Sequence, residues 1–368
     1  MDIVDIECYV LMKPIGWEVG DSRLSITDVY WIVVEIETDT GHTGTGWMGS
    51  LGFAPELLSQ FVDSQFREHL LGRDPMAQSA IHEDLRRQVI YYGETGMSAW
   101  PRGAIDVALW DIKAKAAGEP LFRLLGGEER RIPAYVSLMD AREDDESVVA
   151  DMHDSYAADG FTAFKTKVGN RSITEERTRI AAIRDRIREE AELYVDANQA
   201  WTVKEAIKHV EALSEYRLGF VEEPISEFNL RGHKQVAAEI APPLATGEMF
   251  YRPERFVHLF DIGRVGVVQP DLVRFGGITG MQEAASLAHR HHVPLVPHFY
   301  YAVSAHMVSA APTGHRVEYI PAYDIAPLLS SPPDIEDGHV VLPDRPGHGY
   351  EIAAAARKQY EVEFPASA

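Results

Sequence analysis

The chain has a single cysteine, a shortage of positive charge and no long hydrophobic run. Cys8 stands alone among 368 residues, which excludes an internal disulfide framework and a cysteine-rich zinc module. No stretch reaches the roughly 18 uninterrupted apolar residues of a membrane-spanning helix, so we expect no membrane span. The 35 basic residues are outnumbered by 57 acidic ones, and the net charge of −22 disfavours binding to nucleic acid or to an anionic membrane. The first residues, MDIVDIECYV, lack a basic segment, so we expect no signal peptide and a cytoplasmic protein.

The rest of the composition is that of a globular protein. Hydrophobic residues make up 45% and charged residues 25%, so wholesale disorder is not expected. A chain of 368 residues can bury a large core without cross-links. At roughly 150 residues per domain, this length fits two domains, or one large barrel with an addition.

Residues 1–125 predict strands followed by helices. Alternating hydrophobicity through residues 27–47, with an Asp-Thr-Gly turn, indicates antiparallel strands. Three segments with helical periodicity follow at 55–70, 77–91 and 100–117, and Gly118 is placed as a C-cap. Strands first and helices after predict a separate α+β domain.

Residues 126–344 alternate short apolar runs with helical stretches. The eight runs are AYVSLMD, FTAFKTKV, ELYVDANQAW, GFVEEPI, PLATGEMF, VGVVQPDLVRFGG, VPLVPHFY and RVEYIP. Repeated strand-then-helix units predict parallel strands, because each crossover needs a helix. Eight units of this size predict an α/β fold, a (β/α)8-type barrel, capped by the N-terminal α+β domain. An open doubly wound sheet is the alternative, which the strand count and the missing fingerprint disfavour. We expect the tail, about 345–368, to pack back on the first domain.

Polar residues stand near the C-terminal ends of seven consecutive predicted strands, where buried barrel strands should be nearly all apolar. They are Lys165 and Lys167, Asp196 with Asn198, Glu222 with Glu223, Glu248, Asp271, His298 and Glu318. Their spacing corresponds to about one βα unit, so the fold would bring them to one rim, the face where barrel enzymes place their chemistry. A single such residue would be read as a surface residue. Burying all of them without pairing or a metal ion would be costly.

Three of these residues predict a metal site. Asp196, Glu222 and Glu248 follow successive strands and offer only oxygen donors, which suit a hard cation with open positions, Mg²⁺ above all. A divalent ion would also relieve the repulsion among three carboxylates. In a regular strand Glu223 points the opposite way from Glu222, so we place it behind the ligands.

Two basic groups flank the predicted ion. Lys165 and Lys167 point to the same face of their strand, and two adjacent ammonium groups should lower each other's pKa, which favours one of them as a base. On the other side lies His298, which Asp271 on the preceding strand can orient and charge. Such a site suits removal of a proton next to a carboxylate. The ion and Lys165 would bind that carboxylate, and charge would develop on its oxygens in the ene-diolate.

These residues, in this order, resemble the enolase superfamily and, within it, the mandelate racemase subgroup. The matching pieces are Lys165-Thr166-Lys167, Asp196-Ala197-Asn198, Glu222-Glu223-Pro224, Gly247-Glu248, Gln269-Pro270-Asp271 with Gly276-Gly277, Pro297-His298 and Glu318. In the first domain, Ala104-Ile105-Asp106, Ala108-Leu109-Trp110-Asp111 and Leu124-Leu125-Gly126-Gly127 are similar to the family's helical segment. The resemblance therefore covers nearly the whole chain.

The resemblance implies a role for each rim residue. It implies Asp196, Glu222 and Glu248 as metal ligands, Lys167 as the base on one face, the Asp271–His298 dyad on the other face, and Lys165, Glu318 and Asn198 as substrate contacts. Arg274 occupies a position where some relatives carry lysine, which argues against the subgroup that uses a base there. Relatives also close the barrel mouth with loops of the first domain, here Pro14–Thr27 and Tyr91–Met97. On that basis Trp17, Arg23 and Tyr92 are expected to meet the far end of a substrate.

Two further signals are given structural interpretations. Gly44, Gly46 and Gly49 fit G-x-G-x-x-G, but the βαβ context of a dinucleotide site is missing, so we expect turns and close packing there. The run His289-Arg-His291-His292 lies at a predicted helix end, where cationic side chains suit the helix dipole.

The sequence thus predicts a Mg²⁺-dependent lyase that dehydrates a small sugar acid to a 2-keto-3-deoxy acid. The choice of dehydration depends on analogy with relatives that carry this Lys and His pair. A racemase or epimerase, in which Lys167 and His298 exchange protons across two faces, is the alternative enzyme. A non-catalytic binding or structural relative is the alternative of another class. We expect a small-molecule carboxylate as the partner, no nucleic acid or membrane partner, and a homo-oligomer.

Overall fold

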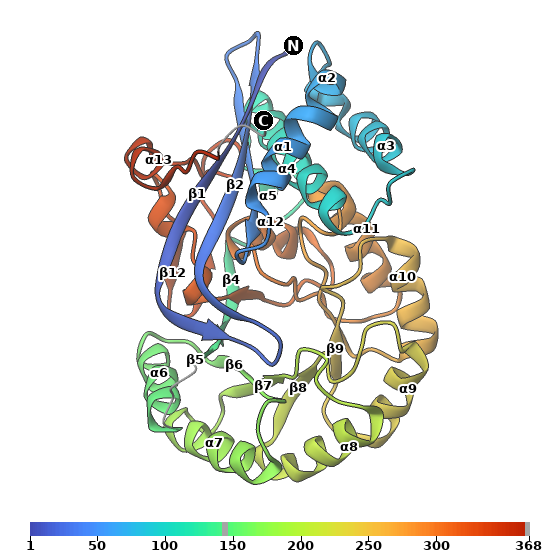
Figure 1. Cartoon of the computed structure of the whole chain (residues 1–368), viewed down its shortest axis with the longest axis vertical. Helices are drawn as coiled ribbons and strands as arrows, with labels where there is room; N and C mark the ends of the chain where they lie inside the picture. Colours follow the sequence, from blue (N-terminus) through green and yellow to red (C-terminus); the bar gives the residue numbers. More distant parts are fainter. Residues whose placement is uncertain (142–145, 365–368) are drawn as a thin grey trace.

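A long antiparallel hairpin opens the chain. The structure, a computed structural model, describes residues 1–141 and 146–364, but not the side chains of Trp17 or of residues 140, 141 and 146–149. The sheet has the order β3-β2-β1-β5, from β1 (Ile3–Gly20), β2 (Ser25–Thr38), β3 (Thr43–Ser50) and β5 (Asp140–Ala141). β1 pairs with β5, which directly follows the first barrel strand, so the hairpin tip is held at the barrel (Figure 1).

The helices of the first part cover this sheet. They are α1 (Pro55–Phe61), η1 (Val62–Phe66), α2 (Arg67–Leu70), η2 (Pro75–Ala77), α3 (Gln78–Val89), η3 (Gly96–Ser98), α4 (Ala99–Ala117) and α5 (Leu121–Leu124). The three predicted helical segments are confirmed, the first with a π-helical turn in its middle. Gly118 caps α4 with φ +70°, as expected, because glycine adopts this left-handed conformation without a Cβ clash.

β3 and α4 pack unusually closely, and glycine makes this contact possible. A Cβ on Gly44 would lie 2.1 Å from the Ala108 carbonyl oxygen, and one on Gly46 would lie 2.0 Å from that of Ala104. The G-x-G-x-x-G run therefore lies within a strand and serves packing, in agreement with the structural interpretation.

The second part is a closed barrel. Its parallel strands are β4 (Arg131–Leu138), β6 (Ala163–Lys167), β7 (Glu192–Asp196), β8 (Leu218–Glu222), β9 (Leu244–Thr246), β10 (Val267–Val268) and β11 (Val317–Tyr319). The predicted run VPLVPHFY joins the ring through isolated bridges, of Leu295 to Val268 and to Gly314, and of His298 to Asp271. β11 pairs with β4 and closes the ring, so the predicted fold class is confirmed.

Helices surround the ring, and side chains fill it. The helices are α6 (Glu146–Ala158), α7 (Ile173–Arg186), α8 (Val203–Ala212), η4 (Ser214–Tyr216), α9 (Leu230–Glu239), α10 (Pro253–His258), η5 (Leu259–Gly263), α11 (Gly277–Arg290) and α12 (Tyr301–Ala310). α6 to α11 form an arc around the strands in Figure 1. A separate cluster of buried residues, including Tyr135, Tyr194 and Phe220, fills the barrel interior, so the barrel is a packed core and its chemistry lies at the rim.

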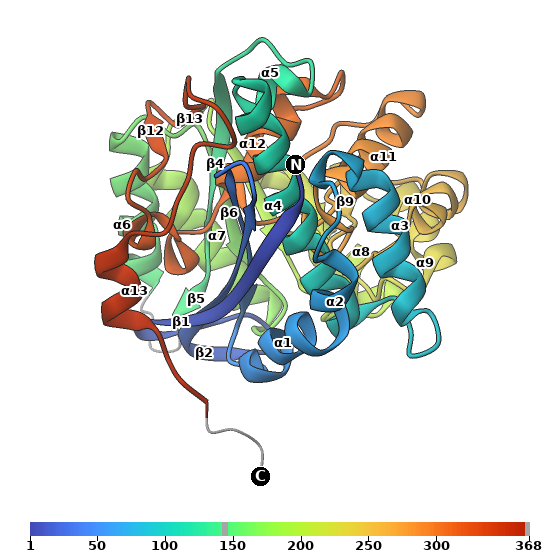
Figure 2. The ribbon, with the colours of Figure 1, turned by 90° about the horizontal axis from the view of Figure 1, so that it is seen from above.

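The last residues return to the first part. After η6 (Pro321–Tyr323) and η7 (Ala326–Leu328), a hairpin of β12 (Asp334–Glu336) and β13 (His339–Val341), which the sequence pattern does not predict, pairs with the start of β4. α13 (Ala354–Tyr360) then lies beside β1 (Figure 2). The Val362 N–H donates to the Val10 carbonyl oxygen. No helix within 1–141 or 146–364 has the length and apolar character needed to cross a bilayer.

Candidate active site

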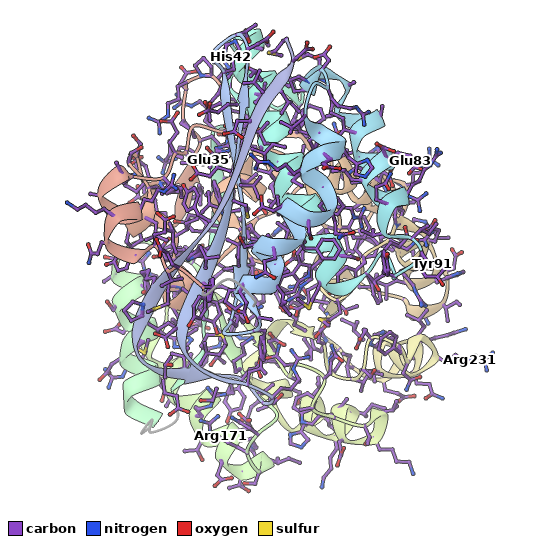
Figure 3. The ribbon with its side chains drawn as sticks, turned by 45° about the horizontal axis from the view of Figure 1, so that its top comes forward. Glu35, His42, Glu83, Tyr91, Arg171 and Arg231 are labelled. Carbon is purple, nitrogen blue, oxygen red and sulfur yellow. The ribbon has the colours of Figure 1, made fainter. Side chains whose placement is uncertain are left out.

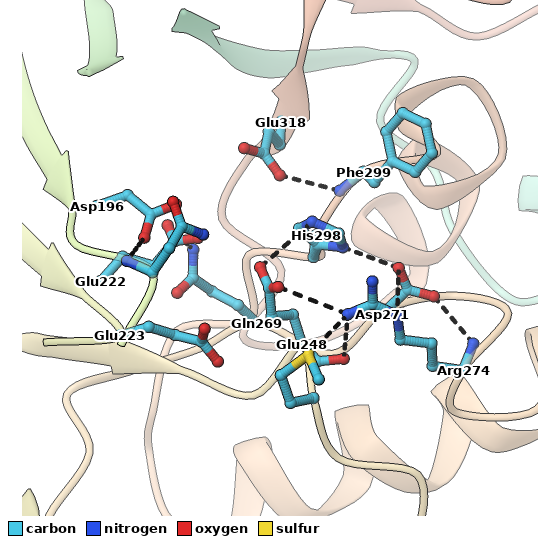
Figure 4. Close-up of polar contacts among 12 residues, drawn as sticks. Asp196, Glu222, Glu223, Glu248, Gln269, Asp271, Arg274, His298, Phe299 and Glu318 are labelled. Atoms are coloured by element: carbon cyan, nitrogen blue, oxygen red, sulfur yellow. Dashed lines mark hydrogen bonds and ion pairs between the residues drawn. The ribbon is translucent and has the colours of Figure 1, made fainter. Parts of the chain in front are cut away.

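The carboxyl ends of the barrel strands bring the predicted ionic residues together (Figure 4). Asp196 and Glu222 are the last residues of β7 and β8, and their Cα atoms are paired in the parallel ladder. The whole set is buried: Lys165, Lys167, Asp196, Asn198, Glu222, Glu248, Asp271 and Glu318 are each at most 6% exposed, and the His298 side chain is 16% exposed. Buried charges require partners, and each of these has one.

Lys165 lies at the centre of the carboxylates. Its Nζ is 2.7 Å from Glu222 Oε2 and 2.7 Å from Glu318 Oε1, and 3.6 Å from Asp196 Oδ2. Burial lowers the pKa of Lys165, but Glu222 and Glu318 outweigh it, so the net shift is upward. Burial likewise raises the pKa of Glu318, yet Lys165 and His298 bring it down to about 2.

Lys167 binds a different carboxylate. Its Nζ donates to Asp196 Oδ2 at 2.6 Å. Burial and the neighbouring Lys165 lower the pKa of Lys167, but Asp196, Glu222 and Asp21 together raise it more, so its pKa is also above the ordinary value. Lys165 does lower the pKa of Lys167, but the expectation of a lysine with a lowered net pKa is wrong for this arrangement, because the surrounding carboxylates exceed the lysine–lysine repulsion.

A buried ion pair holds the lysine-bearing strand from behind. Arg179 of α7 donates to Thr166 Oγ1 at 2.8 Å and to the Lys167 carbonyl oxygen, and its guanidinium lies 3.1 Å from Glu176 Oε2. Sequence reasoning missed this pair. The sequence does contain a pattern that could have predicted this pair: Glu176 and Arg179 are spaced i, i+3 and lie on the same helical stripe as the buried Ile180 and Ile183.

His298 is oriented by Asp271, as predicted from their neighbouring strands. His298 Nδ1 lies 2.8 Å from Asp271 Oδ2, and its Nε2 lies 3.3 Å from Glu248 Oε2. The second Asp271 oxygen accepts the backbone N–H groups of Val273 and Arg274 and so fixes the carboxylate. Burial lowers the pKa of His298, but Glu248 and Asp271 outweigh it, and its pKa is raised.

Arg274 braces the same side of the site. Its guanidinium donates to the Glu248 carbonyl oxygen at 3.1 Å, lies 3.5 Å from Glu248 Oε1, and stacks 5.4 Å from the Trp100 ring. Arg274 therefore contacts both Glu248 and a first-domain side chain, and its cationic charge compensates the carboxylates around His298.

The proposed metal ligands fit a hard cation by donor chemistry. Burial, with a contribution from Asp196, raises the pKa of Glu222 to about 8 despite Lys165. Three buried side-chain oxygens nearby have no hydrogen-bond partner among the described residues: Asn198 Oδ1, Glu223 Oε1 and Gln269 Oε1. As the side chains stand, no three carboxylate, imidazole or thiol groups of residues 1–141 and 146–364 gather closely enough to hold an ion. Lysines bind Asp196 and Glu222, whereas His298 and Arg274 contact Glu248.

Glu223 departs from the regular strand that the sequence predicts. Its φ is +36°, so the chain turns there and Glu223 does not continue the alternation of β8. The side chain is 1% exposed and accepts a hydrogen bond from Gln199 Nε2 at 2.9 Å. Burial and Glu248 raise the pKa of Glu223 well above its ordinary value. The opposite orientation was therefore a wrong expectation, and Glu223 belongs to the same acidic cluster.

Glu318 and Asn198 reach the mouth through different elements. Glu318 comes from β11, and its Oε2 accepts the Phe299 N–H at 3.0 Å. Asn198 follows β7 with φ +44°, and its N–H donates to Asp196 Oδ1 at 2.9 Å. Gln269, which the family resemblance includes but to which the sequence assigns no role, donates through Nε2 to Glu222 Oε2 at 2.6 Å. Gln269 could have been found from the sequence because it lies two residues before Asp271, on the strand that carries the hydrogen-bond partner of His298.

A cavity of about 280 Å³ lies between the barrel mouth and the first part of the chain. From the barrel it is lined by Lys167, Asn198, Glu248, Asp271, Arg274, His298 and Glu318, among others. The hairpin tip and the end of β3 line it from above, and Ser22 Oγ donates to the Ala197 carbonyl oxygen at 3.2 Å. Lys165 lies beneath, bound to carboxylates.

The loop residues that were expected to meet the far end of a substrate have different positions in the structure. Arg23 lines the cavity, whereas the side chain of Trp17 lies outside the described residues. The loop Tyr91–Met97 does not reach the cavity: Tyr92 is 75% exposed, and Tyr91 points outward at the edge of the molecule (Figure 3). The expected contribution of Tyr92 is therefore not supported. Glu94 and Thr95 of this loop instead line a separate hollow of about 480 Å³.

Two sequence profiles match most of the chain. The profile described as mandelate racemase / muconate lactonizing enzyme, N-terminal domain, matches residues 11–126. The profile described as enolase C-terminal domain-like matches residues 147–356.

Similar proteins carry out several reactions. The 3,6-anhydro-alpha-L-galactonate cycloisomerase of Streptomyces coelicolor is 32% identical over 330 residues, which cover 88% of this chain and 90% of the relative. The L-talarate/galactarate dehydratase of Salmonella typhimurium is 30% identical over 359 residues, which cover 95% of this chain and 89% of the relative. A crystal structure of a racemase from Streptomyces coelicolor with bound magnesium has a TM-score of 0.93 and 28% identity, covering 98% of this chain and 100% of that one.

The matched profiles span both parts of the chain, and the relatives align over nearly their whole length. The rim residues, the barrel and the capping sheet agree with that match. The chain therefore belongs to the enolase superfamily and, within it, to the mandelate racemase subgroup, as its motifs predicted.

Proposed function

We propose that this protein is a Mg²⁺-dependent lyase that removes the proton α to a carboxylate and dehydrates a sugar acid to a 2-keto-3-deoxy acid. One observation carries the proposal: Lys167 and His298 line a single small cavity from different strands, each bound to a different carboxylate. Two groups able to exchange protons thus face the same volume. A cavity of about 280 Å³ suits a small ligand.

Asp196, Glu222 and Glu248 would hold Mg²⁺. Bound there, the cation supplies positive charge that stabilises the negative charge developing on the substrate carboxylate. The carboxylates that raise the lysine pKa values include two of these proposed ligands, Asp196 and Glu222, so their charge is shared with the cation in the loaded enzyme.

Residues of the chain bind the substrate and transfer the protons. Lys165 and Glu318 contact the substrate carboxylate, and Asn198 contacts the substrate beside it. Lys167 takes the α-proton, and the electron pair of the C–H bond forms a C=C bond as the β C–O bond breaks. Protonated His298 donates its proton to the departing hydroxyl, which leaves as water, and Asp271 holds the imidazole in place. The resulting enol tautomerises to the 2-keto-3-deoxy acid.

A racemase or epimerase is the second candidate, and the same observation favours it. If Lys167 and His298 exchange protons with opposite faces of one carbon, the product is the inverted acid and no water is lost. The reactions of the relatives do not separate the two, since they include both a dehydratase and a racemase.

Screening the purified protein with Mg²⁺ in D2O tests the proposal. The panel holds mono- and diacid sugars, and lactones and anhydro acids are included because one relative is a cycloisomerase. We expect a keto acid to appear with at least one member. Inverted stereochemistry without a keto acid would replace dehydration by racemisation, and absence of both turnover and α-deuterium throughout would favour a non-catalytic relative.

We also propose which segments of the chain form the cap and which form the catalytic barrel. Residues 1–125 and the tail after about 345 form the capping unit, and residues 126–344 form the catalytic barrel. The backbone bond from Val362 to Val10 supports the assignment of the tail. We propose that the enzyme works in the cytoplasm as a homo-oligomer with a small-molecule carboxylate as its partner, and light scattering of the purified protein tests the subunit number.

A further inference from the structure

The wall of the active-site cavity changes character between the barrel and the cap. Strand ends supply the charged groups, whereas the remaining wall is largely apolar: Leu24, Leu51, Phe53, Met139, Met249 and Ile320. Leu24, Leu51 and Phe53 come from the hairpin tip and the segment after β3, and the other three follow the ends of β4, β9 and β11. A substrate whose carboxylate lies at the strand ends therefore directs its far end into an apolar surface.

Several polar groups near this surface are already used within the protein. Tyr300 Oη accepts the Gly49 N–H at 2.9 Å. Asp21 Oδ1 accepts the backbone N–H groups of Arg23 and Leu24, at 2.6 Å and 2.9 Å, so this carboxylate closes its own turn. These bonds shape the wall and use part of the hydrogen-bonding capacity of both groups: the Tyr300 hydroxyl keeps its own O–H, and Asp21 keeps Oδ2.

Few polar groups among the described residues of this wall remain for the far end of a substrate, and the buried indole Nε1 of Trp100, which has no hydrogen-bond partner among those residues, is one of them. Tyr323 Oη is buried and has no hydrogen-bond partner within the described part of the chain. Of the cap residues that the structure describes in this wall, Arg23 is the one cation, and its guanidinium lies 3.9 Å from the Asp21 carboxylate, which compensates its charge only in part. A chain of several distal hydroxyls, or a second carboxylate, would lose hydration there without regaining equivalent partners.

We propose that the substrate is a deoxy sugar acid: a monocarboxylate that keeps the reacting C2 and C3 hydroxyls and ends in an unhydroxylated carbon, such as a terminal methyl group. This inference rests on the proposed function and names its substrate class. The reacting end uses the ionic rim, and the methyl end is covered by Leu24, Leu51 and Met139. Selectivity arises because an added terminal hydroxyl is left unpaired, whereas a methyl group is buried favourably.

Matched substrate pairs test this directly. 6-Deoxyhexonates of each configuration are compared with the parent hexonates and with the corresponding hexarates, in the presence of Mg²⁺, with kcat/KM for α-proton loss as the readout. For the accepted configuration we expect the 6-deoxy acid to exceed its parent hexonate at least tenfold, equivalent to about 1.4 kcal/mol. A hexonate or hexarate that equals or exceeds the deoxy acid overturns the inference while leaving the proposed function intact. Loss of all α-proton exchange overturns both.

A pair of leucine variants locates the selectivity. Leu51→Asn adds a polar partner to the wall and should reduce the deoxy-to-parent ratio at least threefold. Leu57→Asn, on the exposed face of α1 and outside the cavity, should leave that ratio unchanged. Met139→Gln replaces Leu51→Asn if that variant does not fold. An unchanged ratio in the folded cavity variant would show that this wall does not select the substrate.

Discussion

At the scale of residues, the two lysines of β6 differ in what they can reach. Both side chains point to the barrel mouth, but Lys165 is held by Glu222 and Glu318, whereas Lys167 has one carboxylate partner and lines the cavity. Only a group in contact with the cavity can meet a substrate α-carbon. The geometry therefore supports the proposed transfer of the α-proton by Lys167 rather than by Lys165.

Removing either proposed proton-transfer group should lower turnover by orders of magnitude and preserve the fold. We expect Lys167→Ala and His298→Asn each to lower kcat by about 10² to 10⁴, the contribution typical of general acid–base catalysis. Steady-state kinetics with an accepted substrate measures the loss, and circular dichroism checks the fold. Near-normal activity in both variants would exclude the assignment of these two groups.

Neutralising one proposed metal ligand should weaken metal binding and turnover together. In Glu222→Gln, one of three anionic donors is lost, so we expect the Mg²⁺ dissociation constant to rise at least tenfold. Calorimetric titration with Mg²⁺ measures this without substrate. Glu189→Gln, at a side chain that is 81% exposed, is the matched control. An unchanged Mg²⁺ affinity in Glu222→Gln would remove Glu222 from the ligand set.

At the scale of elements, the contact between β3 and α4 fixes the position of the cavity wall that the first part of the chain supplies. Gly46 lies against the backbone of Ala104, and Gly49, at the far end of the same strand, gives its N–H to Tyr300 beside His298. A shift of β3 away from α4 would move the cavity wall with it. Close packing in the capping sheet therefore positions residues that line the active site.

Adding a single methyl group at Gly46 should destabilise the protein strongly. Its Cβ would lie 2.0 Å from a backbone oxygen, so Gly46→Ala forces β3 and α4 apart, and we expect a loss of about 3 kcal/mol or more. In Gly41→Ala the new Cβ meets nothing within 4 Å, and only the φ of +82° opposes it, so about 1 kcal/mol should be lost. Urea unfolding compares them, and equal losses would contradict the packing argument.

At the scale of the whole molecule, a buried histidine pair joins three parts of the chain. His306 of α12 accepts the Phe122 N–H through Nδ1, and its Nε2 lies 3.1 Å from the His348 carbonyl oxygen. His348 in turn bonds through its N–H to Asp111 of α4 at 2.9 Å. The barrel, the capping helices and the tail therefore depend on neutral imidazoles in one place.

Mild acid should weaken this junction. Burial, with a contribution from His348, lowers the pKa of His306 to about 3, from an ordinary value of 6.5. A lowered histidine pKa means that the unfolded chain binds the proton first, so the stabilisation is complete above pH 6.5 and declines as the pH falls toward 3. For His306 alone we expect about 2 kcal/mol less free energy of unfolding at pH 5 than at pH 6.5.

Unfolding by urea between pH 5 and pH 7.5 measures this slope. His306→Gln removes the titrating group and should flatten the dependence, although its stability at pH 7.5 is lower. His258→Gln, at an exposed position, should keep the original slope. The same slope in His306→Gln would show that other groups govern the acid response.

Local patterns in the sequence were enough to predict much of the fold of this protein and the residues at its barrel rim. Strand and helix periods are set by neighbouring residues, so the barrel, the capping helices and the cap at Gly118 could be predicted. The ionic residues could also be found, because a charged side chain at the end of a buried strand is conspicuous in sequence. Their convergence on one rim follows from the barrel itself, since parallel strands all end on the same face.

Only the tertiary structure decided the features that depend on distant neighbours. The raised pKa of Lys167 results from Asp196 and the carboxylates around it. The turn at Glu223 results from a positive φ, and the apolar wall from segments such as Leu51 and Met139 that meet only after the two parts pack. The loop Tyr91–Met97 resembles a lid in sequence but lies elsewhere. The sequence by itself determined the chemistry available at the rim, because residue type and strand period are local. The tertiary structure decided what that chemistry can reach, because contacts between the cap and the barrel are not local.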